Sequence, residues 1–384
     1  MKFYVDCVGC EQRQLDAQRI ITYLELNGHK RTTSPEPADY NIIVTCGVDK
    51  SAEKASLQRV AGLADKVTDT SRLIVSGCLP AISPDRLREY GITRTVSSRR
   101  LEDFDKELEG HISVPMREIP YPNKSVFDER DDPTGGLLDS LTPRGEYELA
   151  KNGFKIRVNN GCLMACSYCV IRDAMGKLVS VPFDEIVEQF EKAVQRKEPT
   201  IMLMGGDTGV YGYDIGTRFY TFLDRALEVP GNHRVFIHDF NVNWYLRHAD
   251  EYDAVFEKNE SQHHRLRGVN MPVQSGSDRI LKLMKRPYTS SDVVDRLKNV
   301  KKRNPSLNLG THIITGFPTE TETDFNATME LLGNVDFDFL SVFMYSEHER
   351  AKSAGIGGKV GSDIARERAS RIANQFGERV KVFG

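Results

Sequence analysis

The sequence predicts an α/β protein in which a small N-terminal parallel sheet is followed by a partial (β/α)6 TIM-type barrel. The first observation is that short apolar runs alternate with helical patterns along most of the 384 residues, and such alternation is typical of parallel sheets. The second is that cysteines or glycines follow several of these runs. Because parallel sheets bind ligands at the carboxyl ends of their strands, these cysteines and glycines are the candidate functional residues.

Composition is that of an ordinary globular protein. Charged residues make up 28% and hydrophobic residues 39%, and the length allows two or three domains. The N-terminus has no apolar signal region, and no apolar run approaches the length of a membrane span. The seven cysteines are odd in number, and most lie beside a glycine rather than at disulfide spacings. We therefore expect a cytoplasmic protein whose cysteines bind a metal or a cluster, and the net charge of −3 argues against a dominating phosphate-binding surface.

Residues 1–125 are expected to form the N-terminal parallel-sheet (flavodoxin-like) domain. The predicted strands are Lys2–Val5, Asn41–Thr45 and Leu73–Ser76, and the predicted helices are Glu11–Asn27 and Lys50–Ala64. Each strand leads into a loop with a cysteine: Cys10, Cys46 and Cys78. Neighbouring parallel strands end at one edge of a sheet, so three thiolates are expected to converge there. Coincidental burial of three separate cysteines is the alternative, and for Cys7 a small apolar core position is favoured over a ligand.

Residues 126–150 are expected to be a linker, because the stretch is rich in Asp, Pro and Gly. Residues 151–384 are expected to form a second domain of about six βα units. The predicted strands are Lys155–Val158, Ile201–Met204, Val235–His238, Gly268–Pro272, Leu309–Ile314 and Phe339–Met344, and the predicted helices include Phe183–Arg196, Ser291–Lys302 and Ser362–Val380. Such a repeat predicts a partial barrel whose loops at the C-terminal face carry the site.

Three cysteines of this second domain follow one another as CxxxCxxC: Cys162, Cys166 and Cys169. Three thiolates on a short loop can bind three irons of a cubane cluster and leave the fourth iron open for a small chelating molecule. A structural zinc site needs four protein ligands, and no further His or Cys follows at finger spacing. A zinc knuckle or three core cysteines are the alternatives.

The CxxxCxxC spacing, with Tyr168 just before the third cysteine, resembles the signature of the radical S-adenosylmethionine (SAM) enzymes. The resemblance implies a [4Fe-4S] cluster whose open iron binds SAM, and whose reduced form cleaves SAM to a 5′-deoxyadenosyl radical. Cys162, Cys166 and Cys169 would then be the catalytic cluster ligands.

Three stretches of the N-terminal domain resemble the methylthiotransferase family. GCEQRQLDA (9–17) is similar to GCQMNxxDS of that family, ADYNIIVTCGV (38–48) to ADxxIINTCxV, and VSGCLP (75–80) to xTGCxxQ. The resemblance implies that Cys10, Cys46 and Cys78 hold an auxiliary [4Fe-4S] cluster that presents sulfur. A second SAM would methylate this sulfur before the methylthio group joins the substrate radical. Arg13 and Thr45 depart from the pattern, because the family has asparagine at both positions.

The second domain has further stretches that resemble the same family. MGGDTGVYGYDIG (204–216) is similar to a segment of methylthiotransferases that act on threonylcarbamoyladenosine in tRNA, and MPVQSGSDRILKLMKRPY (271–288) is similar to PVQSGSDxxLxxMxRxY. The resemblance implies that six residues bind SAM: Tyr168, Gly205, Gly206, Asp207, Gln274 and Ser275. His312 replaces an aspartate of the family and is expected to be a core or rim histidine.

The sequence departs from the family where substrate contacts are expected. Met175 and Val181 replace two arginines, and we expect the RNA-gripping TRAM domain of the family to be absent. Fewer phosphate contacts favour a peptide, protein side chain or small metabolite as the substrate. The alternatives are a tRNA methylthiotransferase acting on a modified adenosine of the threonylcarbamoyladenosine type, sulfur insertion without methylation, and a non-catalytic cluster-binding sensor. The expected partners besides the substrate are a flavodoxin- or ferredoxin-type reductant and a sulfide donor.

Overall fold

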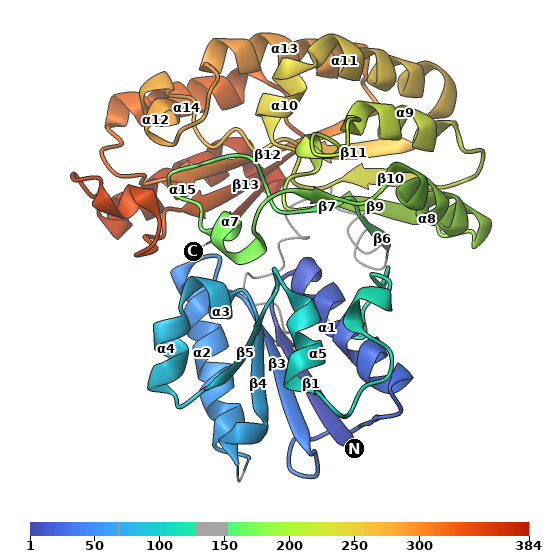
Figure 1. The fold of residues 1–384 in the computed structure, drawn as a ribbon. Coiled ribbons are helices and arrows are strands. Elements are labelled where there is room, and N and C mark those ends of the chain that lie inside the picture. The colour runs from blue at the N-terminus through green and yellow to red at the C-terminus, as the bar shows by residue number, and fades with distance from the viewer. Residues whose placement is uncertain (68, 128–152, 384) are drawn as a thin grey trace. The chain divides into compact units, whose positions relative to one another are not determined.

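The computed structural model describes residues 1–67, 69–127 and 153–383. These residues form two compact units, one of 1–127 with Val170–Gly176 and one of 153–169 with 177–383. Each unit is built around its own parallel sheet, and helices cover the sheet (Figure 1). The predicted linker lies outside the described residues apart from Val126 and Phe127. The α/β fold class predicted from the strand–helix alternation is confirmed.

The first unit has a five-stranded sheet in the order β2-β1-β3-β4-β5, which is the order of flavodoxin-like sheets. All its strand pairs are parallel: β1 (Lys2–Val8), β2 (Lys30–Arg31), β3 (Tyr40–Thr45), β4 (Leu73–Gly77) and β5 (Arg94–Ser97). The three strands predicted from apolar runs are the three central ones. The two edge strands were not predicted, because Lys30–Arg31 and Arg94–Ser97 have no apolar run.

Helices cover both faces of this sheet. They are α1 (Glu11–Leu26), α2 (Lys50–Ala64), α3 (Leu79–Ile82), α4 (Pro84–Glu89) and α5 (Phe104–Glu107). In Figure 1, α1 and α5 lie on one side of the strands and α2, α3 and α4 lie on the other. The buried residues form two clusters that match this division, one with Ile20 of α1 and Phe104 of α5, the other with Leu57 of α2 and Leu87 of α4. The short helix α7 (Ile171–Met175) belongs to this unit, and Ser98 Oγ donates to the carbonyl of Ala174 at 3.1 Å.

The second unit has a seven-stranded parallel sheet in which spatial order follows chain order. Its strands are β6 (Phe154–Arg157), β9 (Thr200–Met204), β10 (Arg234–Ile237), β11 (Leu266–Asn270), β12 (Asn308–Thr315), β13 (Phe339–Met344) and β14 (Val380–Phe383). The first six are the predicted strands. The seventh was not predicted, because the last helix was expected to reach Val380, whereas it ends at Phe376. A separate antiparallel pair, β7 (Asn159–Asn160) and β8 (Val179–Ser180), brackets the CxxxCxxC loop.

Helices follow most of the strands in this unit. They are α8 (Phe183–Gln195), α9 (Phe219–Glu228), α10 (Val242–Arg247), α11 (Ala249–Lys258), α12 (Asp278–Leu283), α13 (Ser290–Arg303), α14 (Glu322–Asn334) and α15 (Ser362–Phe376). The predicted cap of α13 is present, since Thr289 and Asp292 form a capping box. Every helix in the described part of the chain is too short or too polar to cross a lipid bilayer.

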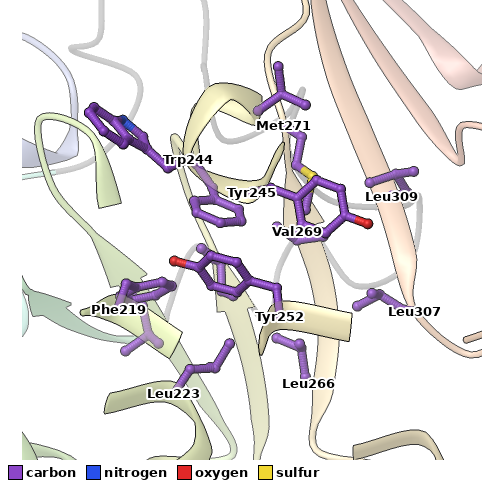
Figure 2. Close-up of a cluster of buried hydrophobic side chains, with 14 of the residues drawn as sticks. Phe219, Leu223, Trp244, Tyr245, Tyr252, Leu266, Val269, Met271, Leu307 and Leu309 are labelled. Atoms are coloured by element: carbon purple, nitrogen blue, oxygen red, sulfur yellow. The ribbon is translucent and has the colours of Figure 1, made fainter. Parts of the chain in front are cut away.

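The core of the second unit lies between its sheet and the helices around it. Figure 2 shows Phe219 of α9, Tyr245 of α10 and Tyr252 of α11 in one buried cluster with Val269 of β11 and Leu309 of β12. Close packing of large aromatic side chains makes this side of the sheet rigid. The strands therefore present the loops at their carboxyl ends in fixed positions.

Candidate functional site

Three neighbouring strands of the first unit deliver one cysteine each. Val8 of β1 pairs with Thr45 of β3, and Thr45 pairs with Gly77 of β4. Cys46 and Cys78 follow Thr45 and Gly77 directly, and Cys10 follows Val8 by two residues. The register of the sheet thus brings the three predicted auxiliary-cluster cysteines to one end of three adjacent strands.

The backbone of each cysteine is held by its surroundings. The Cys46 N–H donates to Ser56 Oγ at 3.0 Å, and Ser56 Oγ donates to the Cys46 carbonyl at 2.8 Å. The Cys78 N–H donates to the Thr45 carbonyl at 2.8 Å, and the Cys10 carbonyl accepts the first hydrogen bonds of α1. Gly77 has a φ of +97°, and a side chain there would meet the Thr45 carbonyl oxygen at 2.2 Å, so glycine is required before Cys78.

The thiols of Cys46 and Cys78 interact directly. The hydrogen bond from Cys46 to Cys78, together with burial, raises the pKa of Cys46. The same hydrogen bond, helped by the positive charge of Arg13, lowers the pKa of Cys78 to about 7 although burial opposes it. Cys78 is therefore the thiol of this pair that ionises first, which suits a thiolate ligand.

Cys7 lies inside β1 and behaves differently from the three loop cysteines. Its side chain is buried in the apolar cluster on the α1 face of the sheet, and burial raises its pKa. A neutral thiol in the core agrees with its expected structural role.

The CxxxCxxC loop of the second unit is fixed to two other elements. Ser167 donates through its N–H to the Met284 carbonyl at 3.1 Å and through Oγ to the Leu283 carbonyl at 2.7 Å, just after α12. The Ser167 carbonyl accepts from the Ser353 N–H at 2.8 Å. The ring of Tyr168 packs into an apolar cluster with Ile280 and Phe317 among others. The three cysteines are thus presented by a loop held at its centre.

Asp207 connects this loop to the end of β9. Its Oδ2 lies 3.6 Å from Cys162 Sγ and accepts from Trp244 Nε1 at 2.7 Å, while its Oδ1 accepts from the N–H groups of Gly209 and Asn241. Burial raises the pKa of Asp207 to about 6. Burial, followed by the charge of Asp207, also raises the pKa of Cys162, so the uncoordinated Cys162 is a neutral thiol at pH 7.

The predicted SAM-contacting glycines allow the cluster loop to approach β9. A side chain on Gly205 would lie 2.0 Å from Asn159 Oδ1, and one on Gly206 would lie 2.4 Å from the Gly161 carbonyl oxygen. The Gly206 N–H donates to Asn159 Oδ1 at 3.2 Å. The two glycines therefore have a packing role next to the first cysteine of the loop, beside the ligand contact that the resemblance implies.

Gln274 and Ser275 differ in what their side chains can do. Gln274 has a φ of +80°, and this strained backbone is held because its N–H and carbonyl both pair with β12. Its buried Oε1 has no hydrogen-bond partner among the described residues. The Ser275 hydroxyl is fully buried and bonded to Thr328 Oγ1 and to the Ser277 N–H. Gln274 is thus available to a ligand, whereas Ser275 serves the backbone that positions it.

Arg286 belongs to the stretch MPVQSGSDRILKLMKRPY (271–288), but it was not predicted as a site residue. Its side chain is 6% exposed, and Nη2 donates to the Tyr168 hydroxyl at 3.0 Å. Within the described residues, its Nε and Nη1 have no hydrogen-bond acceptor. Burial alone would lower its pKa, but Tyr168, Tyr288 and Cys166 keep the pKa raised, so the guanidinium stays charged. A buried cation with unused donors suits an anionic ligand. The position of Arg286 in the family-like stretch could have indicated a functional role, but the sequence did not show that its side chain is buried.

His312 is buried on β12, as expected. Its Nε2 lies 2.8 Å from Asn270 Nδ2, and its ring packs edge-on against Phe343. Burial lowers the pKa of His312 to about 4, so the ring is neutral at pH 7. A neutral ring can accept the hydrogen bond from Asn270 Nδ2, whereas the buried Oδ1 of Asn270 has no hydrogen-bond partner among the described residues.

Each cysteine trio offers the soft sulfur ligands that iron–sulfur clusters take. Within the described part of the chain, no group of three or more His, Cys, Asp or Glu is arranged to hold a metal ion. A cluster differs from a single ion, because each thiolate binds a separate iron. The donor types, the short loops and the electrostatic interaction of Cys162 with both Cys166 and Cys169 fit such a cluster.

Two family descriptions match the two units. Residues 156–332 match the Radical SAM superfamily, and residues 2–96 match a family described as Uncharacterized protein family UPF0004. Among solved structures, the radical SAM methyltransferase TsrM of Kitasatospora setae has a TM-score of 0.59 at 14% identity, over 89% of this chain and 72% of that one. At such identity the likeness concerns the fold alone.

Curated relatives match nearly the whole chain. A "Probable threonylcarbamoyladenosine tRNA methylthiotransferase" of Pyrococcus horikoshii is 31% identical over 90% of this chain and 77% of its own length. The ribosomal protein uS12 methylthiotransferase RimO of Thermosipho melanesiensis is 29% identical over 97% of this chain and 82% of its own. A tRNA-2-methylthio-N(6)-dimethylallyladenosine synthase of Helicobacter acinonychis is 26% identical over 98% of this chain and 83% of its own length. The chain therefore belongs to the radical SAM methylthiotransferase family of enzymes.

Proposed function

We propose that this enzyme attaches a methylthio group to an unactivated carbon of its substrate, using SAM and two [4Fe-4S] clusters. The observation that carries the proposal is the in-register delivery of Cys10, Cys46 and Cys78 by three adjacent strands, separate from the CxxxCxxC loop. One cysteine trio would suffice to cleave SAM. A second trio is what a separate source of sulfur requires.

The two trios have different roles in this proposal. Cys162, Cys166 and Cys169 are the ligands of the SAM-cleaving cluster, and Cys10, Cys46 and Cys78 are those of the auxiliary cluster. When bound, the first cluster supplies the electron that converts SAM to a 5′-deoxyadenosyl radical, and the second supplies the sulfur. Ser167 and Tyr168 hold the first loop in place through α12.

Two side chains are the best supported SAM contacts. Gln274 offers a buried Oε1 without a hydrogen-bond partner among the described residues, and that oxygen can accept from the ammonium or ribose hydroxyls of SAM. Arg286 offers two buried nitrogens, Nε and Nη1, whose N–H groups can donate to the carboxylate of SAM. Gly205, Gly206 and Asp207 contribute by fixing Cys162 and the end of β9.

For the substrate, we propose a peptide, a protein side chain or a small metabolite. Met175 and Val181 are uncharged where the family pattern has arginines, and each missing cation removes a possible phosphate contact. The Thermosipho relative is named for a ribosomal protein substrate. These two points support a substrate other than nucleic acid.

A tRNA adenosine of the threonylcarbamoyladenosine type is the second candidate. It is favoured by the segment DTGVYGYDIG (207–216) and by the 31% identity to the Pyrococcus relative. Salt-sensitive binding of tRNA would distinguish it, because neutralised phosphates make affinity fall steeply with salt.

The test uses the anaerobically reconstituted chain, a reductant and SAM labelled on its methyl group. We expect 5′-deoxyadenosine, and label in protein or peptide when a cell extract is offered but not when total tRNA is offered. Cys166→Ala is expected to abolish 5′-deoxyadenosine formation, and Cys46→Ala to preserve it while stopping label transfer. Cys7→Ala, in the same unit but in the core, is the matched control and should retain both.

Each alternative gives a different result in this experiment. Label in tRNA would establish the second candidate. Sulfur in the product without label would show sulfur insertion without methylation, and absence of 5′-deoxyadenosine would show a cluster-binding sensor. We also propose a cytoplasmic location with a flavodoxin- or ferredoxin-type reductant and a sulfide donor, because the thiols require a reducing compartment.

A further inference from the structure

A buried ion pair lies beside the three cysteines of the first unit. Arg13, in the first turn of α1, lies 2.9 Å from Asp16, and their side chains are 2% and 1% exposed. Taking two charges out of water is costly, and a buried ion pair often stabilises a fold no more than apolar residues would. The charge at Arg13 is therefore a feature of this chain that folding alone does not explain.

The stem of Arg13 lies against Gly9, in the loop that carries Cys10. A side chain on Gly9 would meet Cβ and Cγ of Arg13 at 2.8 and 2.9 Å and Cβ of Cys46 at 3.5 Å. Because Gly9 has no side chain, the stem of Arg13 and the side chain of Cys46 can both pack beside it at the end of β1. The Arg13 N–H also donates to the Cys10 carbonyl at 2.8 Å. Arg13 is thus next to two of the three cysteines through its backbone and its stem.

The guanidinium is not fully satisfied by Asp16. The contact is an ion pair without hydrogen-bond alignment, and Nη1 of Arg13 has no hydrogen-bond acceptor among the described residues. Burial alone would lower the pKa of Arg13, but Asp16 and then Cys78, Cys10 and Cys46 raise it well above its usual value. All three cysteines therefore lie within the electrostatic reach of this cation.

The two charges of the pair act unequally on Cys78. At Cys78 the effect of Arg13 on the pKa exceeds the opposite effect of Asp16. At Cys7, in the core, the order is reversed. Although the pair is neutral as a whole, Cys78 is therefore closer in effect to its positive member than to its negative one.

We propose that Arg13 is a positioning residue that supplies the positive charge needed to balance the auxiliary cluster and an anionic sulfur ligand, hydrosulfide or a thiolate, bound to it. The inference rests on the proposed function, in which Cys10, Cys46 and Cys78 hold that cluster. A nearby cation stabilises the more negative, reduced form of a cluster and so raises its reduction potential. It also favours binding of an anion over a neutral molecule.

The test isolates the auxiliary cluster in the full-length chain. Replacing Cys162, Cys166 and Cys169 together by Ala leaves one predicted cluster, whose midpoint potential is measured by titration followed by electron paramagnetic resonance. In this background, Arg13→Gln is expected to change the one-electron reduction equilibrium at least tenfold toward the oxidised form, a shift of about 59 mV or more to lower potential. Arg13→Lys keeps the charge and should shift the potential less.

Asp16→Asn distinguishes electrostatics from damage to the fold. Removing the anion leaves the cation in place, so the midpoint potential should rise instead of fall. Sodium sulfide serves as the anionic probe, and its apparent affinity for the cluster should decrease in Arg13→Gln but not in Asp16→Asn. General disruption of the site would move both variants in the same direction.

The outcomes separate this inference from the proposed function. If the background chain binds no iron instead of about four irons, the proposed auxiliary site is wrong and the inference is lost with it. If it binds iron but Arg13→Gln leaves the potential and sulfide affinity unchanged, only the role of Arg13 is overturned. If Arg13→Gln itself loses its iron, the midpoint potentials of Asp16→Asn and Arg13→Lys test the role of Arg13 instead. A raised potential in Asp16→Asn with a near-unchanged one in Arg13→Lys supports the proposal, and any other combination contradicts it.

Discussion

The carboxylate of Asp207 lies 3.6 Å from the sulfur of Cys162, so the end of β9 contacts the first cysteine of the CxxxCxxC loop directly. The same carboxylate oxygen accepts the indole N–H of Trp244 at 2.7 Å. Trp244 comes from α10, which packs into the aromatic core shown in Figure 2. Cys162 is therefore positioned by the core of the second unit and not by its loop alone.

Trp244→Phe tests this connection. The substitution removes the donor from a buried carboxylate oxygen, and leaving such a group short of a partner costs about 1–3 kcal/mol. We expect urea unfolding of the iron-free chain to show a loss of this size, and the reconstituted variant to hold less iron. Tyr245→Phe is the control, since Tyr245 lies in the same helix as Trp244 but its hydroxyl donates to Asp253 of α11 and not to Asp207. Full iron content in Trp244→Phe would argue against the connection.

Gly206→Ala is expected to displace the cluster loop. The new methyl group would lie 2.4 Å from the Gly161 carbonyl oxygen, a backbone atom that cannot move without the loop. Formation of 5′-deoxyadenosine from SAM should fall by at least about tenfold, because small misplacements of reacting groups have large effects on rate. Gly333→Ala on α14, where a side chain meets nothing within 4 Å, should keep full activity and gain up to about 1 kcal/mol in stability. Normal activity of Gly206→Ala would show that the loop tolerates the shift.

The three central strands of the first unit and their cysteines could be predicted from the sequence because each strand is a clear apolar run that is followed by a loop with a cysteine. The edge strand at Lys30–Arg31 could not, since two residues show no pattern and the strand is specified by pairing with β1. The last strand at Val380–Phe383 could not, because the helical pattern before it was expected to continue to Val380. The surroundings of several side chains could not be predicted from the sequence either. The burial of Arg286 and of Arg13 and the bond of Ser275 to Thr328 depend on residues that only the fold brings near.

Arg286→Gln is expected to weaken SAM binding. The variant keeps a hydrogen-bond donor but loses the positive charge, and charge-assisted hydrogen bonds are roughly twice as strong as neutral ones. We expect the Kd for SAM, measured anaerobically by calorimetry on the cluster-loaded chain, to rise by about tenfold or more, corresponding to about 1.4 kcal/mol. Arg286→Lys should show a smaller increase, because lysine keeps the charge without the planar fork. An unchanged Kd in both variants would mean that Arg286 serves Tyr168 and the loop only.

Asp324 provides the clearest pH-dependent contribution to stability. Burial favours its neutral form, but hydrogen bonds from Arg279, Ser277 and Thr321 outweigh burial and hold its pKa well below the usual value. A lowered pKa stabilises the folded chain above the unfolded-state pKa of about 4, and this contribution is lost as the pH falls through and below that value. Asp324 also completes the capping box of α14.

Asp324→Asn should therefore destabilise the chain at pH 7 by about 1–2 kcal/mol, the range for loss of a capping interaction. The difference in free energy of unfolding between this variant and the unsubstituted chain, measured with urea, should be smaller at pH 3 than at pH 7. At pH 3 the carboxyl group of the unfolded chain becomes protonated, and this reduces the stability that the folded carboxylate contributes. Asp363→Asn is the control, since this residue is 95% exposed and pairs with Arg366 at the surface, so little change is expected at either pH. A difference that stays constant between pH 7 and pH 3 would show that Asp324 acts through its shape and hydrogen bonds, with no contribution from its charge.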